Sequence, residues 1–516
     1  MLPTETDFEA QVSMETEAVP VPEDPPFHIL FAGDYTGRAN SLGASDEKLP
    51  VPVPIEIDRD NFEEVMGHSN VSLRIEPGGE GTGAVTLRFR GLDDFHPDSI
   101  FRTVPLFSDL RDLRKRLLDP AEYDAAAREV RSWVDDEAYS EPEAPREAAK
   151  AAPEQTVEGG DLLDDILGSA KRDADSYATQ TTDKTELSRL VRELVKPHLV
   201  KTDEAEQAKL VAVIDGMTSD LMRKIVHHPE FKSLEAAWRG LYLVVRRVET
   251  ASDLKLFLYD LSKEELTRDL KAVDDLTDSQ YFRVAVKDAM ESTRVESWAL
   301  ICGNYDFELN VEDTATLIRL AKISNVINAP FVSHIRPQML GIESLAAHPT
   351  PADWDLAEDS EAGKLWAMLR TVPEAVNLGL AIPRFLVRLP YGEDTEPAEA
   401  FDFEELTEEG KHDQYLWANP SFVCGLVLAW GYRAFGWEIR GRYQLNVDGL
   451  PTHVYSEDGE TKTKPCGEIA MTHEACDALL EQGLIPIISF KDTDRVRLGG
   501  VQSIAFPAKD LNGRWE

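Results

Sequence analysis

The stretch from residue 135 to residue 160 limits how this chain can fold more than any other feature. It reads DDEAYSEPEAPREAAKAAPEQTVEGG, in which acidic residues, proline and alanine dominate and almost no side chain is suited to burial. Such a composition is typical of a linker, because it buries too little apolar surface to offset the entropy of ordering. The 516 residues therefore divide into two regions, and a chain of this length is expected to hold roughly two to four domains.

The region before the linker, residues 27–134, has the pattern of a small α/β unit. FHILFA is typical of a strand, and the Pro-rich VPVPIEI after it predicts an edge strand. DRDNFEEVM predicts a short helix with Asp60 or Asn61 near its N-cap, and VSLRI and AVTLRFR flank PGGEGTG as the two arms of a hairpin. From Asp98 onward, one helix is predicted by apolar residues at helical spacing, namely Ile100, Val104, Phe107, Leu110, Leu113 and Leu117.

An N-terminal arm, residues 1–26, precedes this unit and is polar and rich in proline. Within it Phe8, Ala10, Val12 and Met14 alternate with polar neighbours, as in a strand with one apolar face. No partner strand lies nearby in the sequence. We therefore expect this strand to pair with a distant segment or with another chain.

The region after the linker is helical at first and mixed later. Residues 161–250 open with DLLDDILG, a short amphipathic helix, and continue with further helices. Across residues 251–516, helical runs alternate with the strand-like runs LKLFLY, SWALICG, PFVSHI, GLAIPRFLVR and LIPIISF. The predicted fold class is therefore mixed α/β (α+β) in several domains.

Charge and hydropathy exclude several classes of partner. The chain has 54 basic and 95 acidic residues, a net charge of -41. Such a surface repels nucleic acid and anionic membranes unless a basic patch intervenes, and RDLRKR at 111–116 is expected to be only the solvated face of a helix. The most apolar stretch, FVCGLVLAWGYRAF at 421–434, is too short to cross a bilayer and predicts a buried helix.

The cysteines and the N-terminus favour a reduced, cytoplasmic protein. The N-terminal residues lack the apolar core of a signal peptide. The four cysteines show no CxxC spacing, which argues against a zinc site and against a disulfide framework: Cys302, Cys424, Cys466 and Cys476.

The candidate catalytic motifs are better explained by structure. AGDYTGR follows a strand, but a phosphate-binding loop needs a Lys and a Ser or Thr opening a helix after the glycines, so a tight turn at Gly33 and Gly37 is the preferred interpretation. His227 and His228 are neighbours and cannot bind one ion from a helix; Pro229 is instead well placed to start a new helix. We predict no catalytic residue, no cofactor and no metal site. On the new helix a core stripe is predicted from Phe231, Leu234, Trp238 and Leu241.

Several stretches resemble a known protein family. LFAGDYTGR, IEIDRDNFEEVM and LRFRGLDDFHPDSI are similar to the small subunit of the type VI secretion contractile sheath. VHHPEFKSLEAAWRGLYLVV, IPRFLVRLPYG and YLWANPSF, all after the linker, are similar to its large subunit. The chain resembles a fusion of the two subunits, natural or engineered, with the seam near the linker.

The resemblance implies a fold and a mechanism. Residues 27–134 would be the small-subunit part, and residues 161–250 and 251–516 the helical region and the core of the large-subunit part, with the family's C-terminal part missing. Such protomers polymerise into a helical tube in the cytoplasm, around an inner tube and on a baseplate. The tube then contracts without a cofactor, driven by the free-energy difference between two packings of the same subunits. The strand from Phe8 to Met14 would be donated between protomers.

The helix DLLDDILG has two interpretations. A two-turn helix is not stable alone, so it either docks on its own protein, on the helices around Leu187 to Leu194, or is kept for a partner's groove. In sheath large subunits a similar helix is gripped by a ClpV-type AAA+ unfoldase. The resemblance gives that role to Leu162, Leu163, Ile166 and Leu167.

Two classes of function remain open from the sequence. The preferred one is a self-assembling structural sheath protein. The other is a soluble adaptor, a non-contractile assembly protein or an enzyme built on the same fold. Formation of long tubes would distinguish them.

Overall fold

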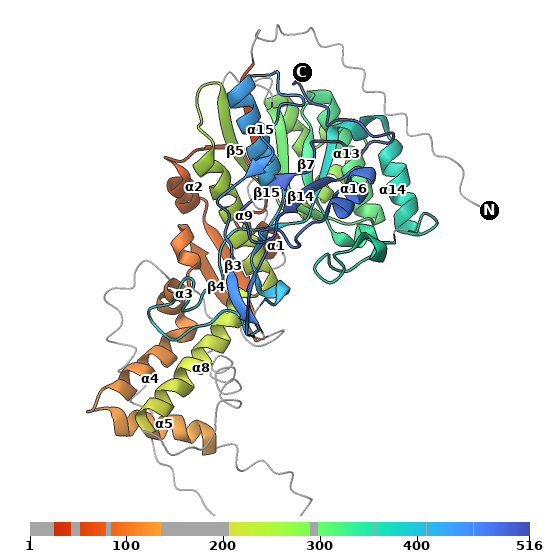
Figure 1. Cartoon of the computed structure of the whole chain (residues 1–516). Coiled ribbons are helices and arrows are strands. Elements are labelled where there is room, and N and C mark those ends of the chain that lie inside the picture. Colours follow the sequence, from red (N-terminus) through yellow and green to blue (C-terminus); the bar gives the residue numbers. More distant parts are fainter. Residues whose placement is uncertain are drawn as a thin grey trace, which may run out of the picture.

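The computed structural model describes residues 25–42, 52–78, 84–135, 206–288, 298–355, 357–408, 410–457 and 459–515. A nine-stranded sheet runs through its body in the order β11-β15-β14-β8-β7-β6-β1-β5-β2 (Figure 1). The strands are β1 (Phe27–Gly33), β2 (Ile55–Ile57), β5 (Leu254–Asp260), β6 (Trp298–Phe307), β7 (Phe331–Ile335), β8 (Leu378–Ile382), β11 (Asn446–Val447), β14 (Ile485–Ser489) and β15 (Val496–Leu498). Strands β5, β1, β6, β7, β8 and β14 are parallel, and antiparallel strands complete both edges.

Helices cover both faces of this sheet, so its central strands are apolar on both sides. Alternate residues of β1 belong to two separate core clusters, with Phe27, Ile29 and Phe31 in one and Leu30 and Ala32 in the other. The first cluster includes helices α9 (Pro229–Arg247) and α15 (Ser421–Phe435). The second includes α10 (Lys263–Lys271), α13 (Val311–Ile327), α14 (Glu361–Thr371) and α16 (His473–Glu481). A mixed α/β fold is therefore confirmed, and a continuous apolar run such as FHILFA is what a strand buried on both faces requires.

Strand β1, the first described strand, pairs with strands of the second region. Strand β1 lies between β5 and β6, with His28 opposite Lys255 on one side and Trp298 on the other. Strand β2, which follows Pro52 and Pro54, pairs with β5 and forms the edge of the sheet, as the prolines of VPVPIEI predict. The small α/β unit expected at 27–134 is thus not closed on itself, because two of its strands belong to the sheet of the second region.

The hairpin and the short helix of the first region agree with the elements predicted from the sequence. The predicted hairpin is present as β3 (Val71–Ile75) and β4 (Val85–Phe89), with the alternate residues buried. The predicted short helix is α2 (Phe62–His68), and its N-cap residue is Asn61, whose side chain makes no capping bond. A five-residue helix, α1 (Arg38–Leu42), follows β1.

The single helix predicted from Asp98 onward is wrong. The chain forms α3 (Pro97–Thr103), a 3-10 turn (Pro105–Phe107) and α4 (Ser108–Leu118). Val104 has an extended backbone, with ψ 123°. The cause is Pro105, which disfavours the helical conformation in the residue before it. All six apolar residues of the predicted stripe are nevertheless buried.

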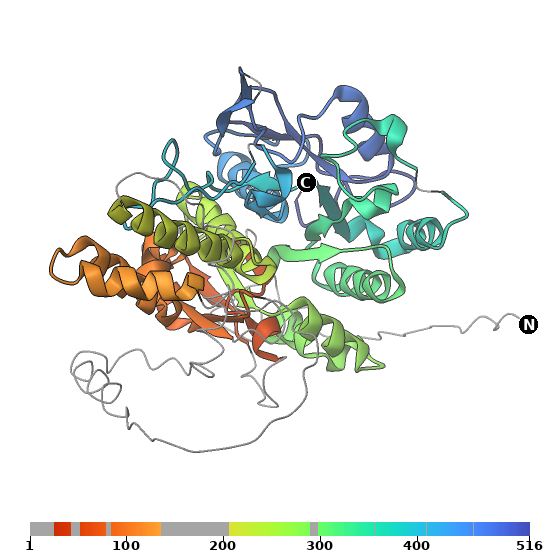
Figure 2. The same ribbon diagram turned by 90° about the horizontal axis from the view of Figure 1, so that it is seen from below.

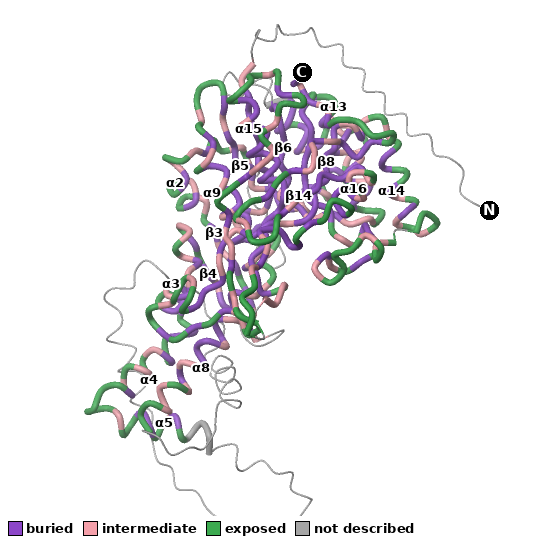
Figure 3. Tube along the Cα trace, in the orientation of Figure 1, coloured by how far each residue is buried: buried purple, intermediate pink, exposed green. Residues whose placement is uncertain are grey.

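A helical region projects from the sheet (Figure 1; Figure 2 shows it from below). It consists of α4, α5 (Tyr123–Asp135) and α8 (Glu206–Val226), which contact one another. Exposed residues are frequent on α4 and α5, whereas the sheet is mostly buried (Figure 3). Helix α8 ends just before Pro229, and His228 takes the extended conformation that the proline favours.

Short elements complete the described chain. They include α11 (Gln280–Phe282), several 3-10 turns, a π-helical turn (Arg283–Asp288), and the two-stranded pairs β9 (Phe385–Leu386) with β10 (Trp417–Ala418) and β12 (Val454–Glu457) with β13 (Glu460–Thr463). The apolar stretch at 421–434 is the buried helix α15, as predicted. Within the described ranges, no helix is long and apolar enough to span a membrane.

Candidate functional site

The loop after β1 is filled by the protein's own carboxylates. Asp34 accepts hydrogen bonds from the backbone N–H groups of Gly37, Arg38 and Ala39, at 2.7, 2.8 and 2.8 Å. Asp260, at the end of β5, accepts from the N–H groups of Tyr35 and Thr36. In a phosphate-binding loop these amides would bind the ligand. Here two carboxylates take that place, which accounts for the Gly-rich turn without a nucleotide.

The charges at this loop compensate one another across the two regions of the chain. The guanidinium of Arg38 makes two bonds of 2.7 Å to Glu265 and lies 3.7 Å from Asp260. Burial raises the pKa of Asp260 to about 6, although the bonds from Thr36 and Tyr35 and the nearby Arg38 favour its ionised form. The loop therefore joins β1 to the second region by hydrogen bonds as well as by strand pairing.

Helix α9 forms the apolar part of the contact between the two regions, which we call the joint. Trp238 is fully buried, and its indole N–H donates a 2.7 Å hydrogen bond to the carbonyl of Tyr35. The rings of Tyr35 and Phe62 meet it edge to face at 5.6 Å. Phe231, in the first turn of the helix, packs against Phe89. Leu234 and Leu241 are buried as well. The stripe thus contacts first-region elements along its length.

A charged cluster is buried beside this stripe. Arg388, only 4% exposed, donates to Glu235 on α9 at 2.8 Å and to Glu405 at 2.7 Å. Glu405 also accepts from the backbone N–H of Tyr391 at 2.8 Å. Burial alone would raise the pKa of Glu405, but Arg388, His227 and these bonds hold it at about 2. An isolated buried charge would be very costly, so the three residues depend on one another.

A polar cleft lies where the parallel strands end. Asp306 at the end of β6 pairs with His334 on β7 at 2.9 Å, and Arg384 after β8 pairs with Glu468 at 2.7 Å. His412 lies 3.2 Å from the same glutamate. Open α/β sheets bind ligands at this edge. Here acids and bases pair with one another, and no group of three or more His, Cys, Asp or Glu suited to a metal occurs among the described residues.

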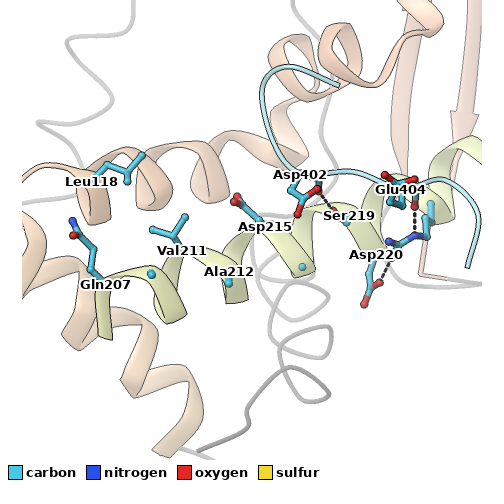
Figure 4. A pocket seen from close by; sticks show the side chains of 12 residues that line it. Leu118, Gln207, Val211, Ala212, Asp215, Ser219, Asp220, Asp402 and Glu404 are labelled. Atoms are coloured by element: carbon cyan, nitrogen blue, oxygen red, sulfur yellow. Dashed lines mark hydrogen bonds and ion pairs between the residues drawn. The ribbon is translucent and has the colours of Figure 1, made fainter. Parts of the chain in front are cut away.

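A groove of the helical region lies between α4 and α8, beside the loop at 402–404 (Figure 4). Its volume is about 640 Å³. Ser219 donates to the carbonyl of Asp402 at 2.6 Å and Arg223 to that of Glu404 at 2.7 Å, which fixes the loop on α8. This groove joins elements from both sides of the linker and is a candidate docking surface.

The predicted interaction residues lie outside the described ranges. This applies to the strand residues Phe8, Ala10, Val12 and Met14 and to the helix residues Leu162, Leu163, Ile166 and Leu167. Both sets remain predictions.

Sequence reasoning missed the buried charged cluster. One signal was available, since Glu235 follows Leu234 and lies one turn after Phe231, on the apolar side of a helix. A carboxylate in such a position requires a buried cationic partner. The identity of that partner, Arg388, is not encoded in any local pattern, because 153 positions separate the two residues.

Each of the two regions of the chain matches a known protein family. Residues 11–144 match the family described as "Type VI secretion system, VipA, VC_A0107 or Hcp2". Residues 208–505, more than half of the chain, match "EvpB/VC_A0108, tail sheath N-terminal domain". The chain belongs to the type VI secretion sheath family. It is also 31% identical, over 363 residues, to the type VI secretion system sheath protein TssC1 of Pseudomonas aeruginosa, covering 69% of this chain and 72% of that protein. A chain that carries both sheath modules is a structural sheath subunit.

Proposed function

We propose that this chain is a sheath protomer that joins a small-subunit and a large-subunit module, polymerises in the cytoplasm into a helical tube and contracts. The main support is the position of β1, a strand of the VipA-like region, in the middle of the sheet of the VipB-like region. The two modules therefore form one folding unit whose covalent linker keeps them in equal number. This is what a lattice built from a single repeating body needs.

The open edge of the sheet supports polymerisation through strand exchange. Among the described strands, β2 pairs with β5 alone, and Ile55 on it is 41% exposed. Val53 just before it is 67% exposed. An unpaired edge beside apolar side chains is suited to receive another strand. The alternating strand from Phe8 to Met14 of a neighbouring protomer is our candidate donor.

Contraction in this proposal uses no cofactor. The work comes from the free-energy difference between two packings of the same protomers. The joint around Trp238 and Arg38 supports the proposal, because a buried and charge-paired joint lets each protomer move as a rigid body while contacts between protomers change. The inner tube, the baseplate and a ClpV-type AAA+ unfoldase are the further partners we propose.

Electron microscopy of the purified chain tests this function. We expect long tubes that form above a threshold concentration and that have one helical symmetry. The matched control is the chain with Ile55→Lys, which places a charge on the open edge and is expected to prevent tube growth without unfolding the protomer. A wild-type protein that stays monomeric at all concentrations, in the presence of its baseplate and inner-tube proteins, would contradict the proposal.

A further inference from the structure

The groove between α4 and α8 is a candidate docking surface for another segment. Val211 and Ala212 on α8 line one wall and Leu118 of α4 the other, and the side chain of Leu118 is 51% exposed (Figure 4). The opposite side of α8 is buried in the core through Ile214, Met217 and other residues. An apolar wall on a helix that is otherwise packed is expected to be covered in the native protein.

The groove is also acidic. Four carboxylates line it against one guanidinium: Asp215, Asp220, Asp402, Glu404 and Arg223. Two of the acids are balanced, because Arg114 holds Asp215 at 2.6 Å and Arg223 holds Asp220 at 2.6 Å. Asp402 and Glu404 are exposed on the loop above the groove. A suitable occupant is therefore an amphipathic helix with basic residues on its polar side.

We propose that residues 186–196 of the same chain occupy this groove as a helix. This segment, ELSRLVRELVK, has apolar residues at helical spacing, namely Leu187, Leu190, Val191 and Leu194. Its polar positions carry Arg189, Arg192 and Lys196 against two glutamates, a rare basic surplus in a chain of net charge -41. The apolar face would cover Leu118 and Val211, and the basic residues would lie near Asp402 and Glu404.

The connection is long enough for this arrangement. Nine residues, 197–205, separate the segment from Glu206, the first residue of α8. Extended, they reach about 30 Å, and α8 with its 21 residues is about 30 Å long. Pro197 ends the segment's helical pattern and favours a turn. The short tether gives a high effective concentration, which favours this segment over a second copy of the chain.

The same charges disfavour the other leucine-rich segment. DLLDDILG carries Asp161, Asp164 and Asp165 and no basic residue, so an acidic groove repels it. With residues 186–196 in the groove, Leu163 and its neighbours would stay available to another protein. This inference does not depend on polymerisation, because it concerns a single protomer.

Cross-linking in the full chain tests the proposal. The four native cysteines are buried, so introduced ones react first. Ala212→Cys is combined in turn with Leu187→Cys, Leu190→Cys and Leu194→Cys, and treated with a short bismaleimide. We expect rapid cross-linking within one chain for at least one pair, and slow cross-linking for the control pair Ala212→Cys with Leu163→Cys. Faster reaction of the Leu163 pair, or cross-links mainly between chains, would overturn the proposal.

Limited trypsin digestion gives an independent readout. We expect cleavage after Arg189 and Arg192 to be about tenfold slower or more than cleavage after Lys171 and Arg172, since docking protects a segment from proteolysis. Leu190→Asp should remove this protection, and Leu163→Asp should leave it intact. Equal cleavage rates at both places in the wild-type chain would overturn the proposal.

Discussion

Trp238 is a buried residue of the second region that contacts the first region. It contacts Tyr35 and Phe62 of the first region from a helix of the second. Trp238→Ala would remove this contact, leave a cavity and leave the Tyr35 carbonyl without its donor. We expect a loss of about 3–5 kcal/mol in the free energy of unfolding, or insoluble protein. Thermal unfolding followed by circular dichroism measures this.

Phe435 provides the matched control, because it is an aromatic residue at a helix end that is 45% exposed. Phe435→Ala should leave the melting temperature within about a degree or two of the wild type, since surface changes cost little. If Trp238→Ala melted at the same temperature as Phe435→Ala, the joint around α9 would contribute little to stability.

Asp260 is expected to make stability depend on pH. Burial raises its pKa from 3.8 to about 6, so the folded protein holds this proton more strongly than the unfolded chain. The contribution to stability is therefore full below about pH 4 and is lost as the pH rises through 6, a change on the order of 3 kcal/mol. Asp260→Asn removes this titration.

The measurement compares the melting temperatures of the wild type and Asp260→Asn between about pH 4.5 and pH 7.5. The wild type should lose stability relative to the variant as the pH rises. Asp359→Asn, at an exposed residue outside the loop after β1 and outside the groove between α4 and α8, is the control and should follow the wild type. A difference that stays constant over this range would show that Asp260 titrates normally.

At the scale of elements, local patterns predicted most strands and helices, and failed where a distant or backbone constraint decided. The alternation in β4 and the apolar run of β1 follow directly from which faces are buried. The helical spacing of the stripe from Ile100 to Leu117 predicts one helix. Pro105 interrupts that helix without changing which of these residues are buried. The neighbours of β1 were not predictable, because strand pairing across more than 200 residues leaves no local pattern.

The leucine-rich segment at 161–168, which its sequence predicts to be a helix, gives a prediction at the same scale. A peptide of residues 157–172 should bind the N-terminal domain of the cognate ClpV-type unfoldase, because its leucines are suited to an apolar groove. Leu163→Asp should abolish this binding and leave tube assembly unchanged. Fluorescence anisotropy measures the peptide, and electron microscopy the tubes. If the wild-type peptide did not bind at high micromolar concentration, the hypothesis of unfoldase binding would be wrong and the segment would have only a structural role.

At the scale of the whole molecule, the N-terminal arm is expected to matter for assembly and not for folding. Deleting residues 1–20 removes the predicted strand from Phe8 to Met14 and leaves every described strand of the sheet in place. The protomer should stay folded and monomeric, with a melting temperature close to that of the full chain. Tubes of normal length from the deletion variant would exclude strand donation by the arm.

The insertion of β1 between β5 and β6 also means that this part of the sheet can form only late in biosynthesis. His28 leaves the ribosome first, but its neighbour Trp298 is made 270 residues later. At roughly 5–20 residues per second, β1 waits on the order of ten seconds to a minute before its second neighbour exists. During that time a strand that is apolar on both faces lacks its place in the sheet. The nascent first region is therefore a natural client for chaperones that shield apolar segments, and slower translation of residues 254–307 would prolong that need.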